Sequence, residues 1–165
     1  MPLIIKNRRI TDDGWQHVAD TEVLPEGPVI VTLTRWRHDR EALLGREDGV
    51  GVRLPNDVDP KEVAQDLDFF QVIALEFPSF KDGRAYSQAH LLRDRYGYRG
   101  ELRAVGDVLR DQLFFMYRSG FDAFELRPDR DIEEALQAFT EFSVTYQAAV
   151  DEPRPLYRRA RQREA

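Results

Sequence analysis

Charged and aromatic side chains gather after two apolar runs in the middle of the chain. One cluster lies in FPSFKDGRAYS (77–87) and the other in RAVGDVLRDQ (103–112). Guanidinium groups near the first turn of a helix suit small oxyanions, because the helix N-terminus is also positive. We therefore predict a binding surface that draws on both clusters. Its members are Asp82, Arg84, Tyr86, Arg103, Asp107, Arg110 and Asp111.

Folding by itself explains part of this chemistry. Ser79 with Asp82 fits a helix capping box, and Asp82 is also a suitable N-cap residue. Asp107 is placed to cap the next helix in the same way. Capping does not account for Arg84 and Tyr86, so a salt bridge with packing and a binding role both stay open for these two.

The predicted strands carry a second polar pattern, because each has one polar residue deep in its apolar run. If consecutive strands are neighbours, these residues form a ladder of alternating charge across the sheet. Buried charges persist only when they are paired and hydrogen-bonded, which favours a structural ladder over charges that point at a ligand. The predicted ladder consists of Arg53, Glu76, Arg103 and Glu125.

Three carboxylates follow or end successive strands and could in principle hold magnesium. They are Glu76, Asp107 and Glu125. Because the ladder and the helix cap already account for them, we predict no metal site. The histidines, His17, His38 and His90, also lack the spacing of zinc ligands.

The chain contains no cysteine, which excludes disulfides, thiol catalysis and thiolate-bound metal centres within it. It also lacks a Walker loop and a GxGxxG fingerprint, so no cofactor is evident from a motif. Redox chemistry here would need a bound organic cofactor, for which a flavin is the candidate, or the metal centre of another protein.

The two clusters are positioned by repeated βα units. Short strands are predicted at 29–34, 50–54, 72–77, 101–105 and 121–126. Helices are predicted at about 38–44, 60–69, 83–96, 107–118 and 131–147. This alternation indicates a parallel sheet with right-handed crossovers. Ligands bind at the carboxyl ends of strands in such folds, which is where both clusters fall.

The predicted fold class is α/β, with a mainly parallel five-stranded sheet that is either a part-barrel of consecutive strand order or an open flavodoxin-like sheet. Residues 1–28 are predicted to form an N-terminal hairpin or arm, residues 29–150 the βα domain, and residues 151–165 a flexible arginine-rich tail. An open sheet edge favours a homodimer or another protein partner.

Composition narrows the functional classes. The net charge of −6 over 165 residues argues against a general nucleic-acid binder, because phosphate binding requires a basic face. No stretch approaches the roughly 18 apolar residues of a membrane span, and the N-terminus lacks the apolar region of a signal peptide. We therefore expect a cytoplasmic protein without membrane contact.

The central block from Phe77 to Leu126 carries a family resemblance, together with VGVRLPNDVDP (50–60) and FSVTYQ (142–147). It resembles an uncharacterised bacterial family whose members are described as probable oxidoreductases involved in sulfite reduction. These are typically encoded beside the sulfite reductase haemoprotein of cysteine biosynthesis. Members often have cysteine where this chain has Ser119, which implies that a thiol there is dispensable. The resemblance implies a pathway but brings no catalytic residues.

Two functions follow as expectations. The first is an accessory protein of assimilatory sulfite reduction that binds the sulfite reductase haemoprotein or its electron donor through the predicted binding surface. The alternative is an oxidoreductase that holds a flavin or a small sulfur oxyanion at the carboxyl ends of the strands.

Overall fold

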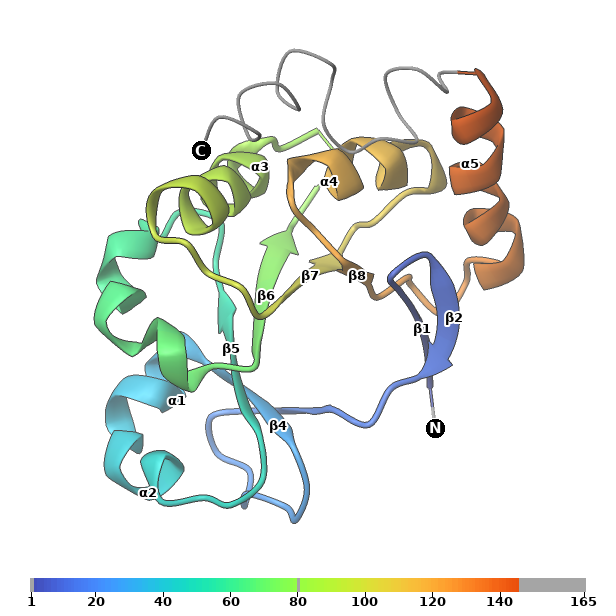
Figure 1. Cartoon of the computed structure of the whole chain (residues 1–165). Helices are drawn as coiled ribbons and strands as arrows, with labels where there is room; N and C mark the ends of the chain where they lie inside the picture. Colours follow the sequence, from blue (N-terminus) through green and yellow to red (C-terminus); the bar gives the residue numbers. More distant parts are fainter. Residues whose placement is uncertain (1, 80, 146–165) are drawn as a thin grey trace.

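The structure is a computed structural model that describes residues 2–79 and 81–145. Eight strands form one curled sheet, shaped as a half-barrel (Figure 1). The strands are β1 (Leu3–Lys6), β2 (Arg9–Asp12), β3 (Gln16–Val18), β4 (Val29–Thr32), β5 (Val50–Leu54), β6 (Val72–Phe77), β7 (Glu101–Gly106) and β8 (Ala123–Phe124). Their order across the sheet is β2-β1-β8-β7-β6-β5-β4-β3.

The prediction of a mainly parallel α/β sheet is confirmed. Strands β3 to β8 pair in parallel, whereas β1 pairs antiparallel with both β2 and β8. The predicted number of five strands is too low, because the N-terminal segment adds three strands to the sheet. The flavodoxin-like alternative is matched only roughly, since the parallel strands follow one another in consecutive order as in a part-barrel.

Helices connect the strands. They are α1 (Leu33–His38), α2 (Arg40–Leu44), η1 (Pro60–Phe69), α3 (Arg84–His90), η2 (Leu91–Arg95), η3 (Arg110–Gln112), α4 (Leu113–Ser119) and α5 (Ile132–Thr145). The first helix begins earlier than predicted, because the Thr32 side chain accepts a hydrogen bond from the Arg35 N–H and so ends β4. The predicted helix end at 146–147 lies outside the described residues.

The two capping predictions are wrong. Gly83 occupies the N-cap of α3 without a side-chain bond. Ser79 and Asp82 instead each accept a hydrogen bond from the backbone N–H two residues later, as in Asx and related turns. Asp107 does not cap a helix either, because the next helical turn begins only at Arg110.

The two faces of the sheet differ in chemistry. Alternate strand residues such as Val31, Val52, Ile73 and Leu102 pack with the helices into the main core. The helices lie around the outside of the curl, as Figure 1 shows. Among the described residues, the inner face has one small apolar cluster, made by Ile30, Val72, Ala74 and Val105 with Trp15 against it. Charged side chains occupy much of the rest of this inner face.

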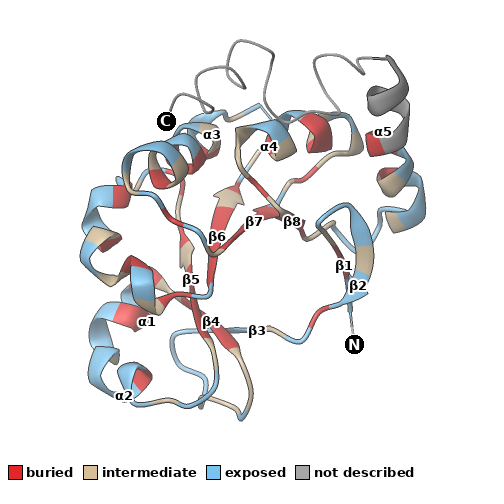
Figure 2. Ribbon diagram, viewed as in Figure 1, coloured by how far each residue is buried: buried red, intermediate tan, exposed pale blue. Residues whose placement is uncertain are grey.

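The sheet comes close to closing on itself. Strands β2 and β3 lie at opposite edges of the sheet, yet only residues 13–15 separate them in the chain. The Cα atoms of Asp12 and Gln16 are therefore at most about 14 Å apart. The connecting segment crosses the open side of the half-barrel, and burial of Asp13 there follows from this path (Figure 2).

The N-terminal segment contributes the strands β1, β2 and β3 to the sheet. Its hairpin turns at Asn7 and Arg8, both with positive φ (52° and 62°), as in a two-residue turn of type I′. The predicted arginine-rich tail, 151–165, lies outside the described residues. Within 2–79 and 81–145, no helix has both the length and the apolar character needed to cross a bilayer.

Candidate functional site

Arg103 is the centre of a charge network on the inner face. Its side chain is fully buried, at 0% exposure. It donates to both carboxylate oxygens of Asp13 (2.8 and 3.1 Å), to Glu101 (2.8 Å) and to Glu125 (3.1 Å). Burial by itself lowers the pKa of Arg103, but the bond to Asp13 and the surrounding negative charges outweigh burial and raise it. The guanidinium therefore stays charged inside the half-barrel.

The network reaches the surface at both ends. Lys6 Nζ lies 2.9 Å from Glu101, and His17 Nε2 lies 2.7 Å from Glu125. Arg103 and Lys6 supply two positive charges against three carboxylates, so protonation of His17 would bring the network to formal neutrality. Burial raises the pKa of Glu125, but the hydrogen bond and charge of His17 and the charge of Arg103 together hold it below its ordinary value.

The predicted four-residue ladder is divided into two pairs. Arg53 pairs with Glu76 (2.5 Å), and Arg103 pairs with Glu125. The sheet register separates the pairs, because Glu76 lies opposite Val105 while Arg103 lies opposite Ala74. Among the described residues Glu76 and Arg103 form no ion pair with each other. Arg53 and Glu76 are partly exposed, at 35% and 28%, whereas Arg103 is enclosed.

Two cavities meet at the Arg53–Glu76 pair, and together we name them the strand-end groove. One, of about 410 Å³, lies over the carboxyl ends of β5, β6 and β7. The other, of about 370 Å³, runs from β3 across β4 and β5 to β6 on the inner face. The side chains that define the groove are His17, Glu22, Thr32, Arg53, Glu76, Asp107 and Arg127. This position corresponds to where ligands bind in related βα architectures.

The outer end of the groove is formed by the turn after β7. Gly106 has φ of 96°, and a Cβ atom there would lie 2.5 Å from the Phe77 carbonyl oxygen. Only glycine fits this position, so β7 can end close against β6. Asp107 follows and accepts from Arg127 (3.3 Å), which also contacts Asp129. The outer end is therefore lined by side chains that are already paired.

The inner end of the groove differs, because an arginine and a histidine there keep nitrogen atoms without a protein partner among the described residues. Arg53 uses Nε to hold Glu76, and among the described residues its two terminal nitrogens have no protein partner. His17 uses Nε2 to hold Glu125, and Nδ1 likewise has no partner in that part of the chain. Each carboxylate fixes the orientation of its partner's side chain. Carboxylates that hydrogen-bond to catalytic or metal-binding histidines act in the same way.

The structure distributes the predicted binding surface over four places. Arg103 cannot belong to an exposed surface, because it is the buried centre of the inner network. Asp82 and Arg84 pair with each other at the start of α3 (2.7 Å). Tyr86 is half-buried, with its ring against Phe77 at 5.3 Å between centroids. Asp107 lines the strand-end groove.

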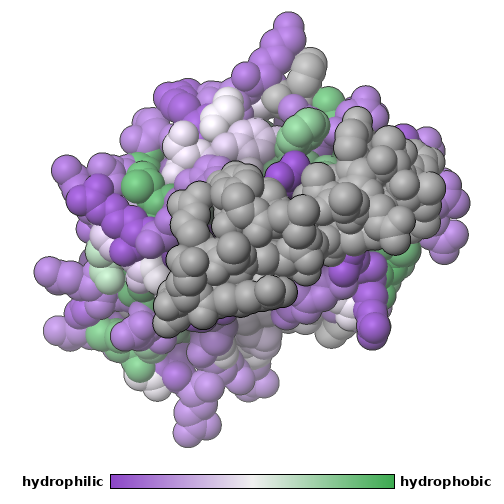
Figure 3. Space-filling model, turned by 45° about the horizontal axis from the view of Figure 1, so that its top comes forward, coloured by the Kyte–Doolittle hydropathy of each residue, from purple (hydrophilic) through white to green (hydrophobic). Residues whose placement is uncertain are grey.

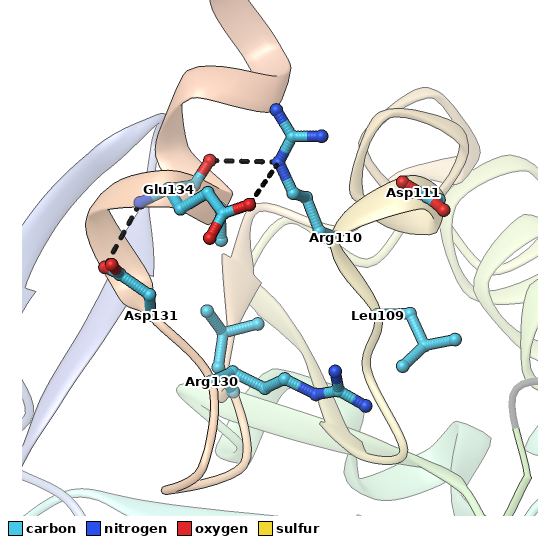
Figure 4. A pocket seen from close by; sticks show the side chains of 8 residues that line it. Leu109, Arg110, Asp111, Arg130, Asp131 and Glu134 are labelled. Atoms are coloured by element: carbon cyan, nitrogen blue, oxygen red, sulfur yellow. Dashed lines mark hydrogen bonds and ion pairs between the residues drawn. The ribbon is translucent and has the colours of Figure 1, made fainter.

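Arg110 and Asp111 line a separate cavity of about 260 Å³, between η3 and the start of α5. Figure 4 shows the Arg110 guanidinium reaching toward Glu134 of α5, where Nε contacts the backbone oxygen at 3.2 Å. Leu109, Leu126 and Ala135 supply its apolar wall. The two predicted loops therefore meet only in part: Phe77 and Pro78 of the first and Gly106 and Asp107 of the second line one cavity, whereas Arg110 and Asp111 line another.

The three carboxylates that were weighed as magnesium ligands, Glu76, Asp107 and Glu125, are each held by an arginine. Across residues 2–79 and 81–145, no group of three His, Cys, Asp or Glu side chains is arranged to hold a metal ion.

Around the grey, undescribed atoms, the strand-end side of the molecule is mostly hydrophilic (Figure 3).

Sequence reasoning missed His17, Asp13 and Arg127. His17 was considered only as a zinc ligand, for which its spacing is wrong. The available signal was the alternation in QHV. Successive strand residues point to opposite faces of a sheet, so His17 points away from the face of Val18 and lies on the inner face. Asp13 and Arg127 lie in loops. The alternation of strand residues does not apply there, so it does not indicate which way their side chains point.

A comparison with protein-family models matches residues 51–157 to a family described as "Bacterial protein of unknown function (DUF934)". Comparisons with curated proteins and with solved structures found no match. The match begins within β5 and includes Arg53, Glu76, Arg103 and Arg127, whereas Asp13 and His17 precede it. Because this match covers more than half of the 165 residues, the chain belongs to this bacterial DUF934 family.

Proposed function

We propose that this chain is an accessory protein of assimilatory sulfite reduction, in the route to cysteine, and that it binds the sulfite reductase haemoprotein or its electron donor. The pathway comes from the resemblance of the block Phe77–Leu126. The structural observation that carries the proposal is the strand-end groove, whose partly exposed charges of both signs come from the ends of four adjacent strands, β5 to β8. Such a role places the protein in the cytoplasm.

The docking surface we propose is the outer end of the groove. Arg127 is 48% exposed there, while its partner Asp107 is 20% exposed. Arg53 and Glu76 continue the same surface inward. Partly exposed charges at the rim of an interface steer association and select the partner, more than they add affinity. A charged partner surface with the opposite arrangement would meet these four side chains.

The test is a pull-down of the sulfite reductase haemoprotein with the tagged full-length chain, in cell extract and with purified components. Association is expected for the native chain and should weaken in Arg127→Glu. Arg37→Glu is the matched control, because Arg37 pairs with Glu62 between α1 and η1, outside the groove. Failure of the two proteins to associate in both settings would contradict the accessory role.

A second candidate is an oxidoreductase that holds a flavin or a small sulfur oxyanion in the groove. The observation that favours it is that, among the described residues, the terminal nitrogens of Arg53 and Nδ1 of His17 have no protein partner. The absorption spectrum of freshly purified protein, before and after added FMN, tests the flavin form. Protein that stays colourless and does not retain FMN on gel filtration would exclude it.

A further inference from the structure

We propose that the inner end of the strand-end groove binds a small inorganic oxyanion between Arg53 and His17, and that His17 takes up a proton when the anion binds. The inference rests on the second candidate function and deepens it by naming the groups that hold the anion and the proton that accompanies it. It does not depend on association with sulfite reductase.

The donors fit this ligand class. Arg53 and His17 line the same cavity of about 370 Å³. The Arg53 side chain is about two-thirds buried (35% exposed) and held through Nε by Glu76, so its terminal N–H groups form a preset pair of donors. A guanidinium edge of this kind matches two oxygens of one anion. Thr32 and the backbone around Ala19 complete the wall.

The carboxylates around the cavity are already engaged, which limits their repulsion of an anion. Glu76 is paired with Arg53, and Glu125 with Arg103 as well as with His17. Glu22 accepts from the Ala19 N–H at 3.0 Å. Asp20, in the same connection, accepts from the Thr32 hydroxyl. Arginine charges thus offset those of Glu76 and Glu125, whereas Glu22 and Asp20 accept hydrogen bonds from neutral donors and keep their charge.

The proton uptake follows from how His17 is held. With Nε2 bonded to Glu125, a neutral imidazole offers Nδ1 as a lone-pair acceptor, which repels an anion, whereas the protonated ring offers an N–H donor. Among the described residues, Glu125 bonds the ring, and Glu22, Arg53 and Glu76 line the same cavity. Asp20 bonds the cavity residue Thr32, and Arg103 lies behind Glu125. Protonation also brings the inner network to formal neutrality, and a bound anion attracts the charged ring.

The experiment is isothermal titration calorimetry of the full chain with sulfate, phosphate and sulfite, at constant ionic strength set with chloride. Sulfate serves for the pH series because its charge stays constant. We expect sulfate affinity to rise about tenfold or more from about pH 8 to about pH 6. Heats in two buffers of different ionisation enthalpy should show the uptake of a proton. Preference for sulfite would link the site to the proposed pathway, and equal affinities would mark a general oxyanion site.

Variants separate the two roles. Arg53→Met should weaken sulfate binding by about tenfold or more at both pH values. His17→Gln should leave residual binding and remove both the pH dependence and the proton uptake. Arg37→Met and His90→Gln, which lie outside the groove, are the matched controls. Thermal melts verify that each variant is folded, and Arg53→Lys, which keeps the charge, replaces Arg53→Met if the latter unfolds.

Three results would overturn the proposal. One is the absence of binding heat with all three anions at millimolar concentration. Another is an equal loss of binding in Arg37→Met, which would indicate unspecific attraction. The last is proton uptake that persists in His17→Gln. None of these results bears on the pull-down, so failure of this inference and failure of the accessory role can be told apart.

Discussion

Asp13 and Arg103, ninety positions apart in the chain, form a two-pronged ion pair inside the half-barrel, with distances of 2.8 and 3.1 Å. Asp13 comes from the short connection between the two edge strands, and Arg103 from the middle of β7 on the inner face. The pair therefore ties the segment that spans the open side to the centre of the sheet. It fixes the path that leads into β3, and hence the position of His17.

Loss of Asp13 should destabilise the fold strongly. Asp13→Ala leaves Arg103 buried with fewer partners, and removal of one member of a buried ion pair costs about 3 kcal/mol or more. Arg103→Met should cost more than Asp13→Ala, because it leaves three carboxylates without their shared partner. The free energy of unfolding in urea, followed by tryptophan fluorescence, measures both. Glu62→Ala at the exposed Arg37–Glu62 pair is the control, with an expected cost below about 1 kcal/mol.

Acidification should weaken the fold through Glu125. Its pKa in the folded protein is held below the ordinary value, so its contribution to stability is present above the unfolded-state pKa and is lost as the pH falls through the folded-state pKa. Below about pH 4.5, the native chain should therefore lose more unfolding free energy than Glu125→Gln. Urea unfolding across this acidic range measures the difference. A native chain and variant with parallel pH profiles would contradict the prediction.

Gly106→Ala should destabilise the groove and the fold together. The substitution places a Cβ 2.5 Å from the Phe77 carbonyl oxygen and forces alanine into φ of 96°. We expect a cost of roughly 1–3 kcal/mol, measured by thermal or urea unfolding. Gly14→Ala is the matched control, because a Cβ there meets nothing within 4 Å, and it should change stability by less than about 1 kcal/mol. Equal costs for the two variants would show that the close approach to β6 is unimportant.

Charge reversal at the outer end of the groove should weaken the proposed association with sulfite reductase. Arg127→Glu places a third negative charge beside Asp107 and Asp129. We expect the association rate to fall by about tenfold at low salt, with a smaller effect at high salt, because steering by rim charges is screened. Surface plasmon resonance at two ionic strengths measures the change. Arg37→Glu should leave the rate unaltered.

Much of the parallel sheet could be predicted from the sequence. The runs at 50–54, 72–77 and 101–105 coincide with β5, β6 and β7, because fully buried strands are continuous β-branched and apolar segments between turn residues. Helix beginnings were less predictable. Thr34 was assigned to a strand, yet the Thr32 cap starts a helix at Leu33. Such ends depend on single hydrogen bonds that compete with strand propensity.

The candidate site was predictable only in part. Arg53, Glu76 and Asp107 were identified from the sequence and lie together in the strand-end groove. Arg110 and Asp111 were assigned to the same surface, but η3 carries them into another cavity beside α5. Arg103 was predicted both as a ladder member and as a binding residue. Because it is buried, only the role in the ion-pair network remains. Spacing along the chain indicates on which face of the sheet a residue lies, but not how deeply its side chain is buried.

The sequence by itself determined the βα alternation, the polar residue within each strand and the absence of cysteine, because these follow from local composition and period. Only the tertiary structure decided which charges meet. The curl of the sheet brings β2 and β3 to within one short connection of each other, so that Asp13 reaches Arg103 and His17 reaches Glu125 across more than 85 residues of chain. Ion pairs of this kind depend on sheet register and curvature, which no local pattern encodes.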